Sequence, residues 1–318
     1  MLRGPLGQTG VKTRFAGHET FPLRRLWLRK AYDAVCEDAE APAPNTFDKD
    51  EGIIRFGVGK NMVAAIKHWA LTCRIIEEDP ERGVGALKAT SFGKLIFDRD
   101  TGLDPFMESL TTTWLLHWQI ASNFERATTW YYAFNHLNAH GFDRDGIAEP
   151  IRLLCAQLDR SRASSTTIKR DVECFVRSYV AKVGAGAVDD QVETVLGELG
   201  LMREVSSRSF AFRHGPKPGL PNGIFLFALA DFWARRAPEQ ATLAIDTLVY
   251  EPGSPGRIFK LDEDALIDRL VDIERVAKGA FLWTDSAGVR AIARRGEGLP
   301  DPASFIASAY PHTKALAA

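Results

Sequence analysis

Three polar residues near the start of the chain carry side chains suited to phosphodiester chemistry: His18, Glu19 and Arg24. A carboxylate such as Glu19 can act as a general base or hold a divalent ion, Mg²⁺ or Mn²⁺. An imidazole can carry a proton, and a guanidinium can stabilise the charge on a pentavalent phosphate. A structural alternative exists, in which Thr20 caps a helix and Pro22 lies in its first turn. We expect His18, Glu19 and Arg24 as the catalytic candidates, with Glu19 as the candidate metal ligand.

The stretch from Asp48 to Phe97 predicts a winged helix-turn-helix, a module that usually contacts nucleic acid. Helical periodicity and turn residues divide it into a short helix, a glycine turn, a longer helix and two strand-like segments around a Pro/Gly loop. In chain order these elements are Asp50–Phe56, Gly57–Gly59, Lys60 to about Arg74, Ile75–Glu78 and Leu87–Thr90.

The longer helix of this module sorts its residues by face. Apolar residues recur at i, i+3 and i+4 spacing and predict a buried side, which comprises Val63, Ile66, Trp69, Ala70 and Cys73. The other side is expected to carry Lys60, Asn61, Ala64, Lys67 and His68. Lysine can donate to guanine or phosphate, and asparagine can pair with adenine. We expect Lys60, Asn61 and Lys67 to bind double-stranded DNA; a solvated face or a protein-docking face is the alternative.

A second helix-turn-helix candidate follows the same order of elements. It consists of helices at Ile147–Leu158, from Ser164 to Tyr179 and at Gln191–Leu199, then a hairpin of Leu201–Glu204 with Ser209–Arg213. Hydroxyl groups, helix N-terminal amides and basic side chains together bind phosphate oxygens well. We therefore expect Thr166, Lys169 and Arg170 to contact the DNA backbone, with an ordinary solvated helix face as the alternative.

The rest of the chain is expected to connect and extend these two modules. Leu103–Leu137 is dense in aromatic residues and predicts two buried helices, and the C-terminal third predicts helices at Gly223–Arg235 and Asp262–Val276, the latter capped by Asp262. The predicted fold is mainly α with small β-hairpins (α+β), in which a helical hub joins two winged helix-turn-helix-like modules. The expected domains are 1–100, 101–145 and 146–318, the last of which combines the second winged-helix-like module with a C-terminal α+β region.

Composition excludes several classes of protein. The 318 residues include 40 Lys and Arg against 41 Asp and Glu, so DNA binding must come from local patches and not from a general basic field. No apolar run is long enough to span a membrane, and Met1–Thr13 lacks the apolar core of a signal peptide, so we expect a cytoplasmic protein with four reduced cysteines. Phe56–Asn61 does not match a phosphate-binding loop, and the sequence has no nucleotide or flavin signature.

Six segments in order resemble a bacterial family of unknown function that is encoded in DNA phosphorothioation clusters, including its SspB-like members. They are FAGHETFPL (Phe15–Leu23), GVGKNM (Gly57–Met62), WLLHWQIAS (Trp114–Ser122), TIKRDVECFVRSY (Thr167–Tyr179), GPKP (Gly215–Pro218) and YEPGSPGRIFKLDED (Tyr250–Asp264). The resemblance implies a role in inserting sulfur into the DNA backbone for anti-phage defence. It also implies three partners: a PAPS-reductase-like sulfurtransferase, a cysteine desulfurase and an ATPase. It assigns no catalytic residue.

Three functions from different classes are compatible with these residues. The protein is a metal-dependent nickase that opens one DNA strand for sulfur insertion, a DNA-reading subunit without activity, or a scaffold that docks the sulfurtransferase. A nickase needs a carboxylate-bearing site, a reader needs only basic faces, and a scaffold needs neither. We take DNA binding with nicking as the working hypothesis, because exchange of a backbone oxygen for sulfur is eased by an opened strand. The oligomeric state and the target motif stay open.

Overall fold

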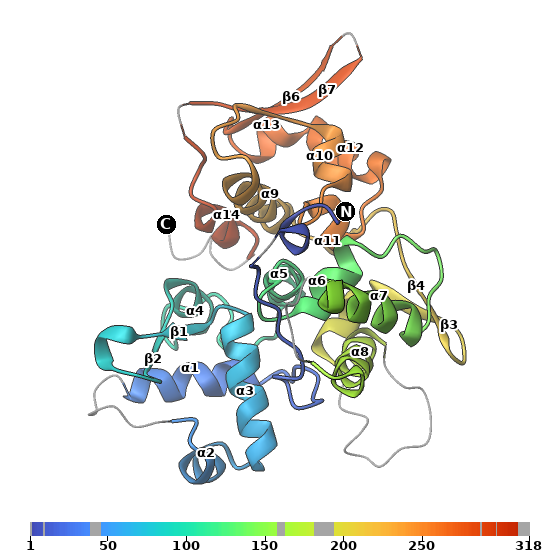
Figure 1. Ribbon diagram of the computed structural model, residues 1–318. Helices are drawn as coiled ribbons and strands as arrows, with labels where there is room; N and C mark the ends of the chain where they lie inside the picture. Colours follow the sequence, from blue (N-terminus) through green and yellow to red (C-terminus); the bar gives the residue numbers. More distant parts are fainter. Residues whose placement is uncertain are drawn as a thin grey trace.

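The computed structural model describes residues 2–8, 10–38, 46–157, 163–180, 194–286, 288–296 and 298–310. Its helices and short antiparallel sheets form an N-terminal unit, a central pair of helices, a unit that contains α7 (Arg144–Gln157) and α8 (Ser165–Tyr179), and a C-terminal unit (Figure 1). The α+β class expected from the sequence is confirmed. No helix in these ranges is both long and apolar enough to cross a membrane.

The N-terminal unit has the element order that the sequence predicts. It contains α1 (Trp27–Asp38), α2 (Lys49–Phe56), α3 (Lys60–Thr72), β1 (Ile76–Glu78), a 3-10 turn η2 (Pro80–Arg82), β2 (Leu87–Ala89) and α4 (Ser91–Phe97). Gly57 ends α2 in the left-handed region, at φ 65°, and its N–H donates to Ile53 O. Because glycine adopts this conformation without steric cost, the chain turns sharply into α3. The β1 and β2 strands then pair antiparallel, with Ile76 opposite Ala89.

The central helices are α5 (Leu110–Ala121) and α6 (Thr128–Asn135). Every α5 residue from Thr111 to Ala121 is buried, as expected for a helix surrounded by others. The aromatic side chains expected here are mostly in the core, which confirms the buried-hub prediction. Phe106 is the exception: it lies 56% exposed and packs under the Arg29 guanidinium. The N-terminal 3-10 turn η1 (Pro5–Gly7) lies near α11 (Pro255–Phe259) of the C-terminal unit (Figure 1).

The unit beside the hub contains α7 (Arg144–Gln157), α8 (Ser165–Tyr179), the 3-10 helix η4 (Val195–Leu199), β3 (Met202–Ser206) and β4 (Ser209–Phe212). Ser164 caps α8 by accepting from the Thr167 N–H at 3.1 Å, as the sequence predicts. Of the helix expected at Gln191–Leu199, the described part is the 3-10 helix η4, and the first three residues of the prediction lie outside the described ranges. Residues 181–193 lie outside the described ranges.

The C-terminal unit contains a three-stranded sheet: an α+β region was expected here, but the sequence analysis did not place its strands. Its elements are α9 (Asn222–Arg236), β5 (Thr242–Ala244), α10 (Ile245–Tyr250), α11 (Pro255–Phe259), α12 (Glu263–Val271), α13 (Ile273–Val276), β6 (Phe281–Ser286), β7 (Val289–Arg294) and α14 (Ala303–Ser308). The three strands are antiparallel in the order β5-β7-β6. The predicted cap is confirmed, since Asp262 accepts from the Ala265 N–H at 2.9 Å.

Candidate nucleic-acid interface and its buried supports

The exposed face of α3 is narrower than its periodicity predicts. Lys60, Asn61 and Ala64 are exposed, and they follow one another along the N-terminal half of the helix. Lys67 is half-buried, with its Nζ 5.8 Å from the centre of the Phe47 ring. Among the described residues, this face therefore offers the Lys60 cation without an ion pair, the Asn61 amide and the small Ala64 side chain, with the Lys67 cation at its edge.

His68 is not part of this face, and its predicted exposure was wrong. Its side chain is 6% exposed and lies against the segment that contains Gly17, where an added Cβ would come within 2.4 Å of the imidazole. Burial lowers the pKa of His68 well below its ordinary value, so the ring is neutral at pH 7. Helical periodicity assigned it to the solvent because only the tertiary structure places another segment over that side of α3.

His18 is held in a buried pair with Asp171 of α8. The two side chains are 1% and 2% exposed, and Nε2 lies 2.6 Å from Asp171 Oδ1. The other ring nitrogen, Nδ1, accepts from the Thr20 N–H at 3.0 Å, so Nε2 carries the proton and donates to the carboxylate. The Ala16 N–H donates to the same oxygen at 2.7 Å. His18 therefore fixes a turn, and both of its nitrogens are already in use.

Glu19 and Arg24 do not join His18 in one constellation. Glu19 is exposed, and it and Thr20 adopt left-handed backbone conformations, at φ 48° and 67°. Thr20 consequently caps no helix, and α1 begins only at Trp27. The Arg24 guanidinium lies over Trp27, 5.4 Å from the ring centre. Within the described ranges no hydrogen bond or ion pair connects His18, Glu19 and Arg24. Of the three, Glu19 is the one whose side chain faces solvent.

The candidate metal ligand Glu19 does not belong to a preformed cluster of metal-ligating side chains among the described residues. Divalent ions in proteins are held by several oxygen or nitrogen ligands that converge on one point. In the part of the chain that the structure describes, no group of three or more His, Cys, Asp or Glu side chains lies close enough to hold a metal ion. A divalent ion held by Glu19 would therefore complete its coordination with water or with a DNA phosphate.

The exposed face of α8 keeps the three predicted DNA-binding residues on the surface. Thr166 and Arg170 are exposed, while Lys169 makes an ion pair with Asp145 of α7 at 3.0 Å. Both members of that pair are well exposed, so it is weak and can exchange for a phosphate. Arg170 has no ion pair within the described ranges, which makes it the freer cation.

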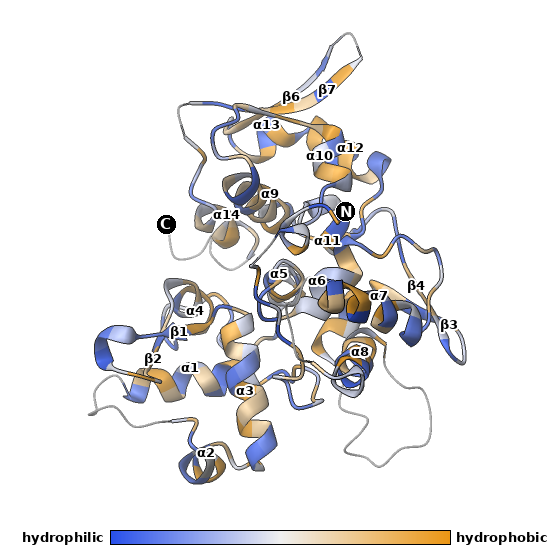
Figure 2. Ribbon diagram, viewed as in Figure 1, coloured by the Kyte–Doolittle hydropathy of each residue, from blue (hydrophilic) through white to orange (hydrophobic). Residues whose placement is uncertain are grey.

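The segment from Phe15 to Thr20 lies between α3 and α8 (Figure 1). Asp171 ties it to α8, and the His18 ring stacks on Trp69 of α3, with 6.0 Å between the ring centres. Along α8 hydrophobic and hydrophilic residues alternate (Figure 2), in keeping with one side that holds this segment and another that faces solvent. The two candidate DNA-contacting helices are thus joined through a buried contact.

Two further buried polar residues connect elements that the sequence analysis treated separately. His117 of α5 bonds through Nδ1 to the Tyr179 hydroxyl and through Nε2 to Ile258 O, both at 2.9 Å. Burial lowers its pKa to about 3. Its place within an apolar helical run was the available signal that it is buried.

Lys260 gave only a weak signal: Phe259 and Leu261 flank it, but lysine is rarely buried. The structure buries it to 2% exposure, with Nζ 2.6 Å from Phe134 O and 4.1 Å from the centre of the Phe212 ring. Lys217 donates to Lys260 O at 3.0 Å. These contacts, with those of His18 and His117, join residues of several of the six sequence segments, which therefore build the scaffold.

Comparisons with known proteins agree on one family. The profile described as "Protein of unknown function (DUF4007)" matches residues 15–310. The structure is similar to "Magnesium ion-bound SspB crystal structure", with a TM-score of 0.85 and 26% identity, covering 98% of this chain and 92% of that one. It is also similar to "SspB crystal structure", with a TM-score of 0.81 and 26% identity over 97% and 91% of the two chains. No functionally curated sequence matches.

Proposed function

The chain belongs to the DUF4007 family, and from that premise we propose that it is the DNA-binding component of a bacterial DNA phosphorothioation system. The end-to-end structural similarity to SspB carries this proposal, because it covers nearly all of both chains at 26% identity. The sequence segments that resemble phosphorothioation proteins support the same role in anti-phage defence.

The N-terminal unit supplies the surface that we propose to contact DNA. Its α2, glycine turn, α3 and β1-β2 hairpin have the order of a winged helix-turn-helix, in which the second helix of the pair enters the major groove. Lys60 and Asn61 lie exposed at the start of α3, the end that reaches base edges in such modules. Lys60 suits phosphate or guanine, and Asn61 suits adenine.

The second unit extends the proposed contact. Its α7, α8, η4 and β3-β4 hairpin repeat the order of the N-terminal unit, and Thr166, Lys169 and Arg170 lie on the open side of α8. Because they combine hydroxyl and basic groups near a helix N-terminus, they suit the DNA backbone more than the bases. The proposed role of α8 is therefore to position the duplex, and that of α3 is to read it.

We propose that the protein nicks one DNA strand, and that a sulfurtransferase, a cysteine desulfurase and an ATPase are its partners. Nicking is tested by incubating supercoiled plasmid with the purified protein in the presence of Mg²⁺, of Mn²⁺ or of a chelator. Conversion to the open circular form would support a nickase. If the plasmid stays supercoiled while duplex binding is retained, the protein is a DNA reader without activity.

DNA binding through α3 is tested by neutralising its cations. Changing Lys60 and Lys67 to alanine should weaken binding to all duplexes by about tenfold at 0.1 M salt. The slope of log Kd against log salt should fall by about one to two, since each neutralised phosphate contact contributes about 0.9. Fluorescence anisotropy of a labelled duplex over a salt series gives both quantities.

Two further variants make this experiment specific. Asn61→Ala should relax sequence preference and leave the salt slope unchanged, because an amide that reads a base releases no counterion. Lys94→Ala with Lys278→Ala removes two exposed lysines elsewhere and should leave affinity unchanged. Equal affinity and slope in the Lys60/Lys67 variant and in the wild type would remove α3 from the interface.

A further inference from the structure

The β3-β4 hairpin projects from the unit that contains α7 and α8 (Figure 1). Its strand β4 is mostly buried: the Phe210 side chain is 2% exposed, and the Phe212 ring packs against Phe134 of α6 with 5.0 Å between the ring centres. Its strand β3 is exposed from Arg203 to Ser206, and so is the turn that follows. The hairpin is therefore anchored through β4, while β3 and the turn face solvent.

The exposed residues of this hairpin include arginines without carboxylate partners. Arg203 lies on β3, Arg208 in the turn and Arg213 directly after β4, and none of them makes an ion pair within the described ranges. Leu201 to Arg213 contains one acidic residue, Glu204. Arg213 lies at the base of the hairpin, where its N–H donates to Leu201 O at 2.9 Å, and Arg208 lies at the tip, so the cations span roughly 17 Å.

The start of α7 connects this hairpin to the outer side of α8. Arg144 pairs with Glu173 of α8, and its guanidinium lies 5.0 Å from the centre of the Phe210 ring. The next residue, Asp145, pairs with Lys169 of α8 at 3.0 Å. The hairpin consequently lies next to the proposed DNA-contacting side of α8, and the Glu173 and Asp145 carboxylates in between are already paired with cations other than those of the hairpin.

The hairpin β1-β2 has the opposite charge. Ile76–Ala89 contains four acidic and two basic residues, and Lys88 lies 3.8 Å from the carboxylates of Glu77 and Asp79. A negatively charged hairpin is repelled by the closely spaced phosphates of a duplex. Of the two hairpins that follow a proposed DNA-contacting helix, β3-β4 is therefore the one suited to the DNA backbone.

The hairpin β6-β7 is basic, but its arginines are bonded to groups of their own unit. Arg290 pairs with Glu263 at 2.6 Å, and Arg295, which follows β7, pairs with Glu274 at 3.2 Å. Arg294 donates to a backbone carbonyl at 2.8 Å. These arginines would have to give up existing partners before they could bind a phosphate.

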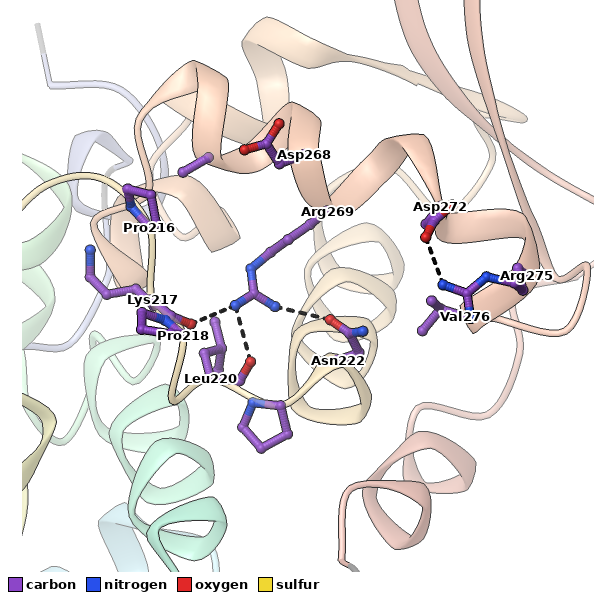
Figure 3. A pocket seen from close by; sticks show the side chains of 12 residues that line it. Pro216, Lys217, Pro218, Leu220, Asn222, Asp268, Arg269, Asp272, Arg275 and Val276 are labelled. Atoms are coloured by element: carbon purple, nitrogen blue, oxygen red, sulfur yellow. Dashed lines mark hydrogen bonds and ion pairs between the residues drawn. The ribbon is translucent and has the colours of Figure 1, made fainter.

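The cations of the groove beside α12 are bonded in the same way. This groove has a volume of about 550 Å³ and lies between α12-α13 and the loop before α9 (Figure 3). Arg269 donates to Lys217 O at 2.7 Å, and Arg275 pairs with Asp272 at 2.6 Å. Because acidic and basic side chains both line the groove, its charge favours neither an anionic nor a cationic ligand.

We propose that the β3-β4 hairpin binds the phosphate backbone of duplex DNA beside the α8 contact. The hairpin then adds a third element to the DNA-binding surface of the proposed function, on which this role depends. A guanidinium matches the geometry of a phosphate and can donate two parallel hydrogen bonds to it. Hydroxyl groups also contact phosphate oxygens, and the exposed Ser206 and Ser207 supply them near the tip. Such contacts carry no sequence information, so the hairpin should strengthen binding to every duplex.

Fluorescence anisotropy of a labelled duplex of mixed sequence, over a salt series, tests this role. Arg203→Ala with Arg208→Ala should weaken binding by about tenfold at about 0.1 M salt, and the slope of log Kd against log salt should fall by about two, since each phosphate contact contributes about 0.9. Arg290→Ala with Arg295→Ala is the matched control. It removes two arginines from another hairpin, where both are paired with carboxylates, and should leave affinity and slope unchanged.

Two further variants separate the effect of charge from an effect on the fold. Arg203→Lys with Arg208→Lys keeps both positive charges and should retain the salt slope of the wild type. Glu204→Gln removes the acidic residue of the hairpin and should raise duplex affinity by about two- to threefold, because it removes a repulsion from phosphate. Glu239→Gln, at an exposed position between α9 and β5, should not raise it. Circular dichroism of each purified variant confirms that it is folded.

A photo-activated cross-linking amino acid gives an independent measurement. At Ser207, in the turn of β3-β4, it should form an adduct with the labelled duplex, whereas at Ser286, exposed at the end of β6, it should not. An adduct with the duplex at position 207 supports the proposal. In a cell extract to which the duplex is added, an adduct to an acidic protein and none to DNA would overturn it.

The salt series distinguishes failure of this role from failure of the proposed function. Unchanged affinity and slope in the Arg203→Ala/Arg208→Ala protein would overturn the role of the hairpin, and so would an equal loss in the Arg290→Ala/Arg295→Ala control. If the variant with Lys60 and Lys67 changed to alanine loses affinity in the same assay, DNA binding through α3 still stands. Absence of salt-dependent duplex binding by the wild-type protein would overturn both.

Discussion

The pair of His18 with Asp171 should be the main support of the segment between α3 and α8. Asp171→Ala removes the acceptor of two N–H groups, the buried one of His18 Nε2 and the partly buried one of Ala16. A hydrogen bond to a charged group contributes about 1.5–3 kcal/mol, and the His18 donor would be left without a partner in the interior. We expect the free energy of unfolding to fall by about 3–5 kcal/mol.

Urea denaturation followed by circular dichroism measures this loss, and amide hydrogen exchange at Ala16 tests whether it is local. Asp145→Ala is the matched control. Asp145 of α7 also forms an ion pair with α8, through Lys169, but its side chain is 73% exposed. Its loss should stay below about 1 kcal/mol. Asp171→Asn should be intermediate, since an amide oxygen still accepts hydrogen bonds. Equal losses in Asp171→Ala and Asp145→Ala, or an Asp171→Ala loss under about 1 kcal/mol, would refute the reasoning.

Three other variants test the remaining residues. Arg170→Ala should weaken duplex binding more than Lys169→Ala, because Lys169 already has a carboxylate partner, and a reversed order in anisotropy titrations would contradict this ranking. Neither change should lower the melting temperature by more than about 2 °C. Glu19→Gln should abolish plasmid nicking and leave duplex affinity unchanged, and full nicking by that variant would exclude Glu19 from the chemistry. Burial lowers the pKa of His117 to about 3 in the folded protein. As pH falls below about 6.5, the imidazole is therefore protonated in the unfolded state before it is protonated in the folded state. The free energy of unfolding should thus decrease toward pH 3 by up to about 1.4 kcal/mol per pH unit. His117→Asn should reduce that slope in urea titrations at pH 7, 6 and 5, and an unchanged slope would count against a buried neutral imidazole.

The sequence by itself determined the elements whose signals are local. Gly57 and Gly59 marked the turn between α2 and α3, Ser164 and Asp262 marked helix starts, and the apolar spacing of Val63 and its neighbours marked a buried side. Each of these signals arises from residues within a few positions of one another, where backbone conformation and capping are decided. The mainly helical α+β class followed from them.

The tertiary structure decided which polar residues are available for function. His18 and Asp171 are 153 positions apart, and their pairing turned a candidate proton carrier into a buried support. The same packing removed His68 from the exposed side of α3 and took Lys260 into the core. The three-stranded sheet of the C-terminal unit likewise depends on pairing β5 with β7, which are separated by several helices. Burial and pairing of this kind depend on segments distant in sequence, so periodicity along one helix or strand cannot reveal them.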